Sequence, residues 1–318
     1  MPGTAVIGGA GFIGSHIVDE LMTLGHEVTV LDNFSEGKLS NLERWRGNPK
    51  LEVIRGDIRD YDMVRRVCDS KGTVFHLAAM SRIQPSITDP VLALSQNVLG
   101  TTHVLEACRI GGVKRVVYSA SSSAYGLKNV PPLREDMKTD CLNPYSLSKK
   151  VGEELMGLYH DLYGLSTVSL RYFNVFGPRH QEEGSYATVI AIFRKQRRLG
   201  QRLTVVGDGE QRRDFTFVSD VVRANMLAAM NWDVGGVLNI GTGQNYSINQ
   251  VAALIGGEVE YIPPRLGEAQ VTLADATLAR ELLGWGPTVF LEGGLQVIES
   301  YERLYPPSGI ISCWDPSL

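Results

Sequence analysis

Short apolar runs alternate with longer stretches of helical periodicity through the first half of the chain. The apolar runs predict strands at Ala5–Ile7, Glu27–Leu31, Leu51–Arg55, Thr73–His76, Arg115–Ser119 and Ser166–Arg171. The stretches between them predict helices near Gly14–Leu24, Met63–Cys68, Val91–Ile110 and Tyr145–Tyr163. Because strands that alternate with helices form right-handed βαβ units, we expect an α/β fold with a doubly wound parallel sheet.

This rhythm breaks after about residue 171. Turn residues crowd the segment FNVFGPRHQEEGSYA, and a predicted helix at Thr188–Leu199 and a strand in LTVVGDG follow it. A later helix is expected to end at Gly284. We therefore expect a first domain over residues 1–171, with a return segment near 214–242, and a smaller α/β lobe over residues 172–318.

The composition, 43% hydrophobic and 21% charged over 318 residues, is that of a soluble globular protein. A formal net charge of −4 argues against nucleic acid as the main partner. Four cysteines form no C-x-x-C pair and no pattern with histidine, so we expect neither a metal site nor a disulfide framework. The chain opens on a strand and loop rather than a signal peptide, and no apolar run reaches the roughly 18–20 residues of a membrane span. We expect a cytoplasmic protein without a membrane partner.

A glycine-rich segment, AVIGGAGFIGSHIV, lies between the first strand and the first helix. Gly8, Gly11 and Gly14 would let the chain turn tightly and let backbone N–H groups approach a diphosphate at the helix start. Eighteen residues after Gly14, the second strand ends at Asp32, which is placed to accept hydrogen bonds from a ribose. A carboxylate there would repel a 2′-phosphate, so the pattern predicts a Rossmann-type domain that binds NAD rather than NADP.

Other polar and small residues follow the next strands. Asp57 comes after the third strand, where Ile58 could cover an adenine, and small residues end the fourth strand in FHLAAM. Asn97 is a polar residue within a helical stretch and could equally be an ordinary exposed position. The remaining candidate cofactor contacts are Phe12, Ile13, Asn33, Ser35, Gly37, Leu77, Ala78, Ala79 and Tyr172.

The segment NPYSLSKKVGEE begins a helix and carries a tyrosine and a lysine four residues apart. Asn143 can cap this helix and Pro144 suits its first position. Residues four apart share one helix face, so Tyr145 and Lys149 could act at one site. Taken alone, the spacing is a weak signal and also fits one turn of an ordinary exposed helix.

Several motifs in order resemble one family: GGAGFIG, Asp32, Asp57, HLAA, Asn97-x-x-Gly100-Thr101, SSS-x-Tyr125-Gly126, PYSLSK, RYFNVFGPR and GDG-x-x-RRDF. Over about residues 4–300 the chain resembles the extended short-chain dehydrogenase/reductase family, in its nucleotide-sugar epimerase branch. Within that branch it is most similar to UDP-glucose and UDP-N-acetylglucosamine 4-epimerases.

The resemblance implies a catalytic role for Tyr145 as the base and for Lys149 as the residue that lowers the pKa of the phenol and holds the nicotinamide ribose. A hydroxyl partner is implied at Ser121, with Ser122 and Ser123 as alternatives. The implied reaction oxidises C4 of a UDP-hexose to a transient ketone, which rotates and is reduced on its other face. NAD is regenerated in each turnover.

Alternative reactions use carboxylates that this chain lacks. Related 4,6-dehydratases carry an Asp-Glu pair after the hydroxyl residue, and UDP-glucuronate decarboxylases carry a Glu there, whereas this chain has Ser122 and Ser123. Epimerisation at C2 of another nucleotide sugar and a non-catalytic NAD-sensing module remain further alternatives.

The resemblance also implies substrate contacts in the second lobe. Asn174, Arg213 and Arg265 match residues that hold the diphosphate and sugar. A small residue, Thr272, stands four positions after Glu268, where galactose-specific relatives have a tyrosine, which favours N-acetylated substrates as well. Other implied contacts are Ser81, Ser123, Tyr145, Tyr186, Val189, Thr204, Val206 and Glu268.

Two further expectations follow from the resemblance. The segment MSRIQPS has Arg82 and Gln84 where relatives often have other residues, and it borders the sugar. Family members form homodimers through a four-helix bundle, which would here use Val91–Ile110 and Tyr145–Tyr163.

Overall fold

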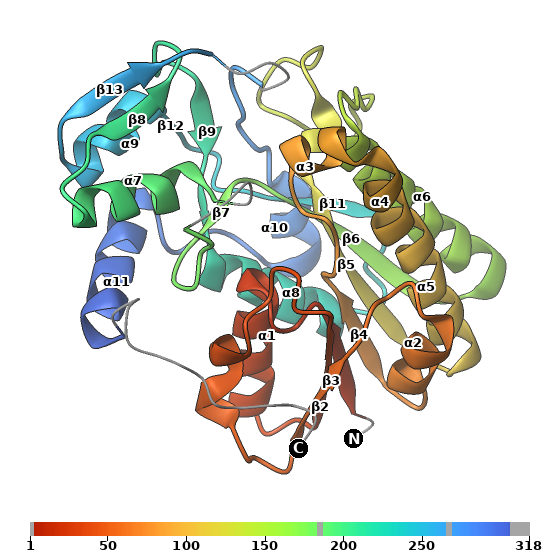
Figure 1. The fold of residues 1–318 in the computed structure, drawn as a ribbon. Helices are drawn as coiled ribbons and strands as arrows, with labels where there is room; N and C mark the ends of the chain where they lie inside the picture. Colours follow the sequence, from red (N-terminus) through yellow and green to blue (C-terminus); the bar gives the residue numbers. More distant parts are fainter. Residues whose placement is uncertain (1–2, 183–186, 265–268, 306–318) are drawn as a thin grey trace.

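A seven-stranded parallel sheet forms the centre of the computed structural model, which describes residues 3–182, 187–264 and 269–305 (Figure 1). The strand order is β11-β6-β5-β4-β1-β2-β3, and every neighbouring pair is parallel. The strands are β1 (Thr4–Ile7), β2 (Val28–Asp32), β3 (Leu51–Arg55), β4 (Thr73–His76), β5 (Arg115–Ser121), β6 (Ser166–Tyr172) and β11 (Val237–Ile240). This confirms the predicted doubly wound α/β fold.

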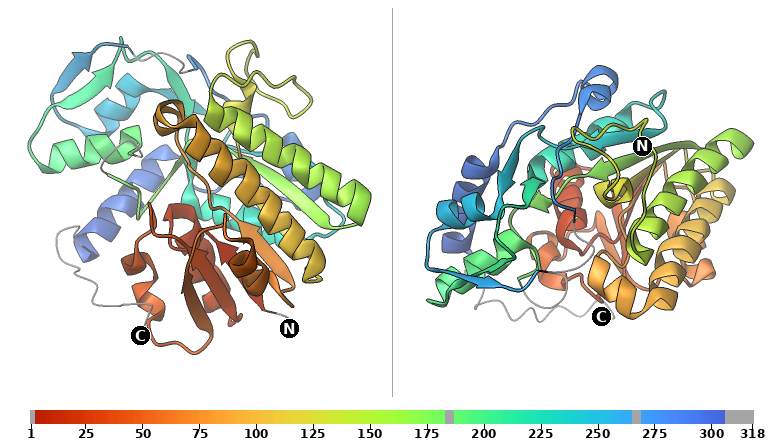
Figure 2. Two further views of the ribbon diagram at one scale, coloured as in Figure 1. Left: turned by 45° about the vertical axis from the view of Figure 1, so that its right-hand side comes forward. Right: turned by 90° about the horizontal axis from the view of Figure 1, so that it is seen from above.

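Helices cover both faces of this sheet, as the two views in Figure 2 show. One face carries α1 (Phe12–Thr23) and α8 (Val218–Met230), and the other carries α2 (Tyr61–Cys68), α5 (Gly100–Ile110) and α6 (Pro144–Tyr163). Successive strand residues point to opposite faces, so Val6 belongs to the first core and Ile7 to the second. The near-continuous apolar strands follow from burial on both sides.

The helix predicted over residues 91–110 is continuous but irregular. It runs through α4 (Pro90–Leu94), a π-helical turn at Ser95–Leu99 and α5, and the short helix α3 (Ile83–Thr88) precedes it. π-turns occur where tertiary contacts pull a residue out of the regular ladder. Here the turn contains Asn97, which is 1% exposed, so Asn97 is not the exposed helix position that the pattern allowed.

Apart from β11 and α8, the described residues after β6 form three two-stranded sheets and four helices, and we keep the name second lobe for this region, whose domain boundary stays a prediction. The strand pairs are β7 (Val175–Phe176) with β10 (Thr216–Phe217), β9 (Arg212–Asp214) with β12 (Asn245–Ser247), and β8 (Leu203–Val206) with β13 (Val259–Ile262). The helices are α7 (Val189–Arg198), α9 (Ile248–Ile255), α10 (Thr277–Leu283) and α11 (Leu291–Leu304). Two 3-10 turns in the first part of the chain are η1 (Leu39–Trp45) and η3 (Ser122–Tyr125). The segment near 214–242 returns to the central sheet, because β11 pairs with β6.

A buried carboxylate joins α8 to the segment that leads into α11. The Asp220 side chain is fully buried and accepts hydrogen bonds from Thr288 N (2.9 Å), Thr288 Oγ1 (2.6 Å) and Val289 N (2.9 Å). It also pairs with Arg223 at 2.8 Å. Asp220 therefore anchors the C-terminal part of the second lobe to a helix of the central sheet.

We expect Asp220→Ala to lower the free energy of unfolding by about 3 kcal/mol, because three donors lose their buried acceptor. Urea denaturation of the purified variant measures this change. Asp233→Ala, at an exposed aspartate in the turn before β11, is the matched control and should stay within about 0.5 kcal/mol of the parent. Equal stability of the two variants would contradict the anchoring role of Asp220.

Candidate active site

The glycine-rich loop after β1 is packed too closely for side chains. A Cβ atom on Gly14 would lie 2.1 Å from the Gly8 carbonyl oxygen, and one on Gly8, whose φ is +86°, would lie 2.6 Å from the Ala78 nitrogen. At the start of α1, no described side chain caps the helix at Gly11 and the first turn holds no acidic residue. The first amide N–H groups of α1 are thus available to an anion, which fits the diphosphate of a dinucleotide.

A carboxylate is held beside this loop at the end of β2. Asp32 is 8% exposed, and it accepts hydrogen bonds from Ala10 N (2.9 Å) and Phe34 N (2.8 Å). Burial raises the pKa of this carboxyl above its usual value, while the backbone donors oppose the shift. After β3, two hydrogen bonds from Arg59 hold Asp57 and lower its pKa to about 2. Both carboxyl groups line the same cavity.

This cavity has a volume of about 590 Å³ and runs from the glycine-rich loop into the second lobe. It lies at the carboxyl ends of the strands, where the strand order reverses between β1 and β4, which is the usual ligand position in such sheets. The predicted site residues that line it are Gly8, Gly11, Phe12, Ile13, Gly14, Asp32, Asn33, Ser35, Gly37, Asp57, Ile58, Leu77, Ala78, Ala79, Ser81, Ser121, Ser122, Ser123, Tyr145, Lys149, Tyr172, Asn174, Val189, Thr204, Val206, Arg213 and Thr272.

Four predicted site residues remain. Tyr186, Arg265 and Glu268 lie outside the described residues. Asn97 is described but does not line the cavity. Its side chain instead accepts a hydrogen bond from Met80 N (2.7 Å) and donates to Met80 O (3.0 Å) and Ser148 Oγ (2.9 Å). Asn97 therefore ties the chain after β4 to α6.

Tyr145 lies in the first turn of α6, which a capping box fixes. Asn143 accepts from Ser146 N at 2.9 Å, and Pro144 occupies the first helical position. The Tyr145 amide donates to Ser86 Oγ at 3.1 Å, so α3 is joined directly to this turn. Burial raises the pKa of the phenol, whereas its hydrogen bond with Ser121 and the charge of Arg82 lower that pKa, and Glu36 raises it further.

Lys149 is 4% exposed and lies one turn further along α6. Its ammonium donates to the Ser119 carbonyl at 2.8 Å and lies 4.9 Å from the centre of the Tyr118 ring. Burial lowers the pKa of Lys149 to about 7, against an opposing effect of Glu153. Arg82 also lowers the pKa of the Tyr145 phenol through its charge, and the effect of Lys149 on that phenol stays a prediction.

The three consecutive serines differ in their position relative to Tyr145. Ser121 ends β5, which extends two residues beyond its predicted end, and its hydroxyl lowers the pKa of the Tyr145 phenol. Ser121 Oγ also accepts from Ser123 N (3.2 Å) and Ser123 Oγ (2.9 Å). Ser123 thus holds Ser121 in place, and this geometry favours Ser121 as the partner of the phenol.

The far end of the cavity is lined from the second lobe. The Asn174 side chain donates to Asp214 O (2.9 Å) and Thr272 Oγ1 (3.2 Å), and its backbone has a φ of +27°. Arg213 donates to Gln270 O at 3.3 Å, and Thr204 Oγ1 accepts from Gln196 at 2.8 Å. Polar groups able to bind a second, more polar ligand therefore converge opposite the glycine-rich loop.

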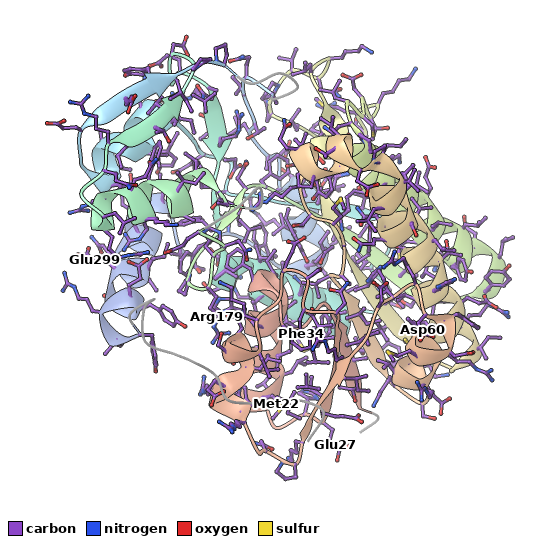
Figure 3. All side chains as sticks on the ribbon, in the orientation of Figure 1. Met22, Glu27, Phe34, Asp60, Arg179 and Glu299 are labelled. Carbon is purple, nitrogen blue, oxygen red and sulfur yellow. The ribbon has the colours of Figure 1, made fainter. Side chains whose placement is uncertain are left out.

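Two lining residues that the sequence pattern left in a loop, Arg179 and His180, join the two lobes. Arg179, labelled in Figure 3, pairs with Asp19 of α1 at 2.6 Å, and the His180 ring lies 4.2 Å from the Phe12 ring. Arg179 ends the turn-rich motif FNVFGPR and His180 follows it, so this motif was the available signal. Their partners in α1 are far away in sequence, so the contacts could not be predicted.

Comparison with known proteins identifies the family of this chain. Residues 4–241 match the model of the NAD dependent epimerase/dehydratase family. The chain belongs to the NAD-dependent epimerase/dehydratase family. It is similar to a UDP-glucose 4-epimerase of Mycolicibacterium smegmatis, with 39% identity over 94% of this chain and 98% of the relative. It is 36% identical to UDP-glucuronic acid decarboxylase 1 of Xenopus tropicalis, over 94% and 71% of the two chains.

Among solved structures, the fold is similar to a UDP-glucose 4-epimerase of Thermotoga maritima determined with UDP-glucose. The TM-score is 0.89 at 38% identity, and the match covers 95% of this chain and 99% of that chain. Three features of the site agree with membership of an NAD-dependent family. They are the close backbone packing of the glycine-rich loop, the start of α1 without a side-chain cap, and Asp32 at the end of β2. These groups would hold the dinucleotide, which supplies a hydride acceptor when bound. No helix among the described residues has the length and apolar character needed to span a membrane.

His76 is fully buried beneath this site, and its titration should make the stability of the protein depend on pH. Burial and the charge of Lys149 lower the pKa of His76 to about 3 from 6.5. Between these two values the unfolded chain binds more protons than the folded one, so stability falls as the pH drops through this window. From pH 7 to pH 5, His76 alone should lower the free energy of unfolding by about 2 kcal/mol.

The test is urea denaturation of the parent and of His76→Gln at both pH values. Glutamine keeps a group that can bond to Thr101 Oγ1, now 2.9 Å from His76 Nε2, but it cannot titrate. The stability difference between the two proteins should shrink by about 2 kcal/mol at pH 5. His26→Gln controls for replacing a histidine in a turn. An unchanged difference would contradict the titration of His76.

Proposed function

We propose that the protein inverts C4 of a UDP-hexose, using Tyr145 as the base. The observation that carries this proposal is that Tyr145 and Ser121 line one cavity, which joins a dinucleotide loop to polar residues of the second lobe. The 4-epimerase names of similar proteins support it. The same cavity would place the C4 hydroxyl of the sugar between the phenol and the nicotinamide.

In the proposed reaction, Tyr145 takes the proton of the C4 hydroxyl as the carbon is oxidised, while Ser121 hydrogen-bonds the same oxygen. The resulting ketone rotates about the diphosphate link and presents its other face. Tyr145 then returns the proton. The phenol is thus restored to its starting protonation state in each turnover. Asn174 and Arg213 would hold the diphosphate throughout.

A UDP-glucuronate decarboxylase is the second candidate, because similar proteins carry that name. It is disfavoured by the residues next to Ser121. Ser122 and Ser123 stand where the resembling decarboxylases and dehydratases have carboxylates, and the Ser123 hydroxyl is bonded to Ser121 at 2.9 Å. A hydroxyl cannot replace a carboxylate as acid or base at neutral pH.

The sugar specificity is also part of the proposal. Thr272 lines the cavity, and its hydroxyl accepts from Asn174 and from the Asp214 amide at 3.2 Å each. Held in this way, a small residue leaves room beside C2, so we infer that UDP-GlcNAc and UDP-GalNAc are accepted together with UDP-Glc and UDP-Gal.

A homodimer is proposed from the outer surface of α4, α5 and α6, which lie side by side at the right of Figure 1. Large apolar side chains are exposed there, including Val91 (78%), Leu158 (48%) and Leu162 (63%). Exposed apolar patches of this kind mark interaction surfaces. A second copy of the chain would cover them in a four-helix bundle. We expect such an enzyme to work in the cytoplasm.

The reaction is tested by incubating the protein separately with UDP-Gal, UDP-GlcNAc and UDP-glucuronate and identifying products by NMR. We expect the C4 epimer of UDP-Gal or of UDP-GlcNAc. Appearance of UDP-xylose or of a 4-keto-6-deoxy sugar would instead establish decarboxylation or dehydration.

Removing the phenolic oxygen tests the base. Tyr145→Phe should lower kcat by roughly 10³-fold or more, because general acid–base catalysis is lost, yet NAD should remain bound. The measurements are turnover and the nucleotide content of the purified protein. Tyr163→Phe, at the exposed end of α6, is the matched control. Retained turnover in Tyr145→Phe would remove Tyr145 from the role of base.

The dimer is tested with Leu162→Glu on the exposed face of α6. A charge placed in an apolar interface should convert a dimer to a monomer, as measured by light scattering after gel filtration. Leu304→Glu, at an exposed leucine of α11, is the control. A monomeric parent protein would contradict the proposed assembly.

A further inference from the structure

The glycine-rich loop lies between two other loops because β1 lies between β2 and β4 in the sheet. On one side, the loop after β2 is bound to it, since Lys38 N donates to Ala10 O at 3.0 Å. On the other side, the chain after β4 touches it where Ala78 N approaches Gly8. Both flanking loops thus rise from the edges of the surface on which a diphosphate would lie.

A hydrogen bond joins these two flanking loops across that surface. Ser81 Oγ, after β4, donates to Glu36 Oε2, after β2, at 3.0 Å. Both residues line the cavity and are partly buried. Because their strands are separated by β1, this bond must pass over the carboxyl end of β1. We call this contact the Glu36–Ser81 bridge.

Glu36 is an unexpected residue for a diphosphate site, because two anions repel. A direct contact with the cofactor therefore does not explain it. Its carboxylate instead accepts a hydrogen bond from the Ser81 hydroxyl of the opposite loop. Arg82 follows Ser81 directly, and Lys38 lies two residues after Glu36; both cations line the same cavity.

We propose that the Glu36–Ser81 bridge is a gate over the dinucleotide site, which must open for NAD to enter and to leave. A gate that is closed in both the free and the loaded protein slows both steps and leaves the affinity almost unchanged. Slow exchange suits a family whose cofactor stays with the enzyme and is regenerated in each cycle. The proposal depends on NAD binding and not on the sugar or on the reaction at C4.

The test measures NADH binding to the full chain freed of nucleotide, by stopped-flow fluorescence, and NADH release on displacement with excess NAD. Ser81→Ala should speed association and dissociation by roughly tenfold each, since a hydrogen bond to a charged group is lost. Ser81→Thr keeps the hydroxyl and should restore rates close to those of the parent. In a Glu36→Ala background, Ser81→Ala should have no further effect, because its partner is already absent.

Thr88→Ala is the matched control, since this exposed hydroxyl bonds only within α3, to Gln84 O at 3.1 Å. Faster dissociation with unchanged association would show a direct contact with the cofactor and overturn the gate. A Ser81→Ala effect that persists in the Glu36→Ala background, or unchanged rates in Ser81→Ala, would overturn it as well. These readouts involve no sugar, so loss of epimerase activity leaves them intact.

Discussion

The close approach of backbone to backbone at the glycine-rich loop is the constraint on which the site depends. With only 2.1 Å between the Gly8 oxygen and a Cβ atom at Gly14, any side chain there would push α1 away from β1. That contact sets where α1 starts and so where its free amides point. Asp32 and Ala78 are then held against the same loop from the two neighbouring strands.

Behind the reacting phenol lies a frame of buried polar groups. Arg171 and Glu153 form two hydrogen bonds of 2.7 Å while almost completely buried, and Glu153 also favours the charged form of Lys149. Buried ion pairs of this kind contribute little net stability but are costly to break singly. Their effect here is to fix the position of α6 against β5 and β6, and with it the positions of Tyr145 and Lys149.

The electrostatics around Tyr145 combine opposing contributions. Burial makes the phenolate costly, and Arg82 and Glu36 act on it with opposite signs. Lys149, whose pKa burial lowers to about 7, donates a hydrogen bond to the Ser119 carbonyl. The positively charged nicotinamide of the family's cofactor would be a further charge that favours the phenolate. The protein without its cofactor thus favours the neutral phenol over the phenolate.

The alternation of apolar runs and helical stretches by itself determined the parallel sheet. Local spacing determined the glycine-rich loop, Asp32 and the Tyr145–Lys149 pair. These features depend on residues that are near one another in the chain. Tertiary structure decided the rest. Asn97 became a buried tie in a π-turn, Ser121 was separated from its two neighbours, and Glu36 met Ser81 across β1. These contacts join residues that are distant along the chain or depend on packing against distant elements, so no local pattern specifies them.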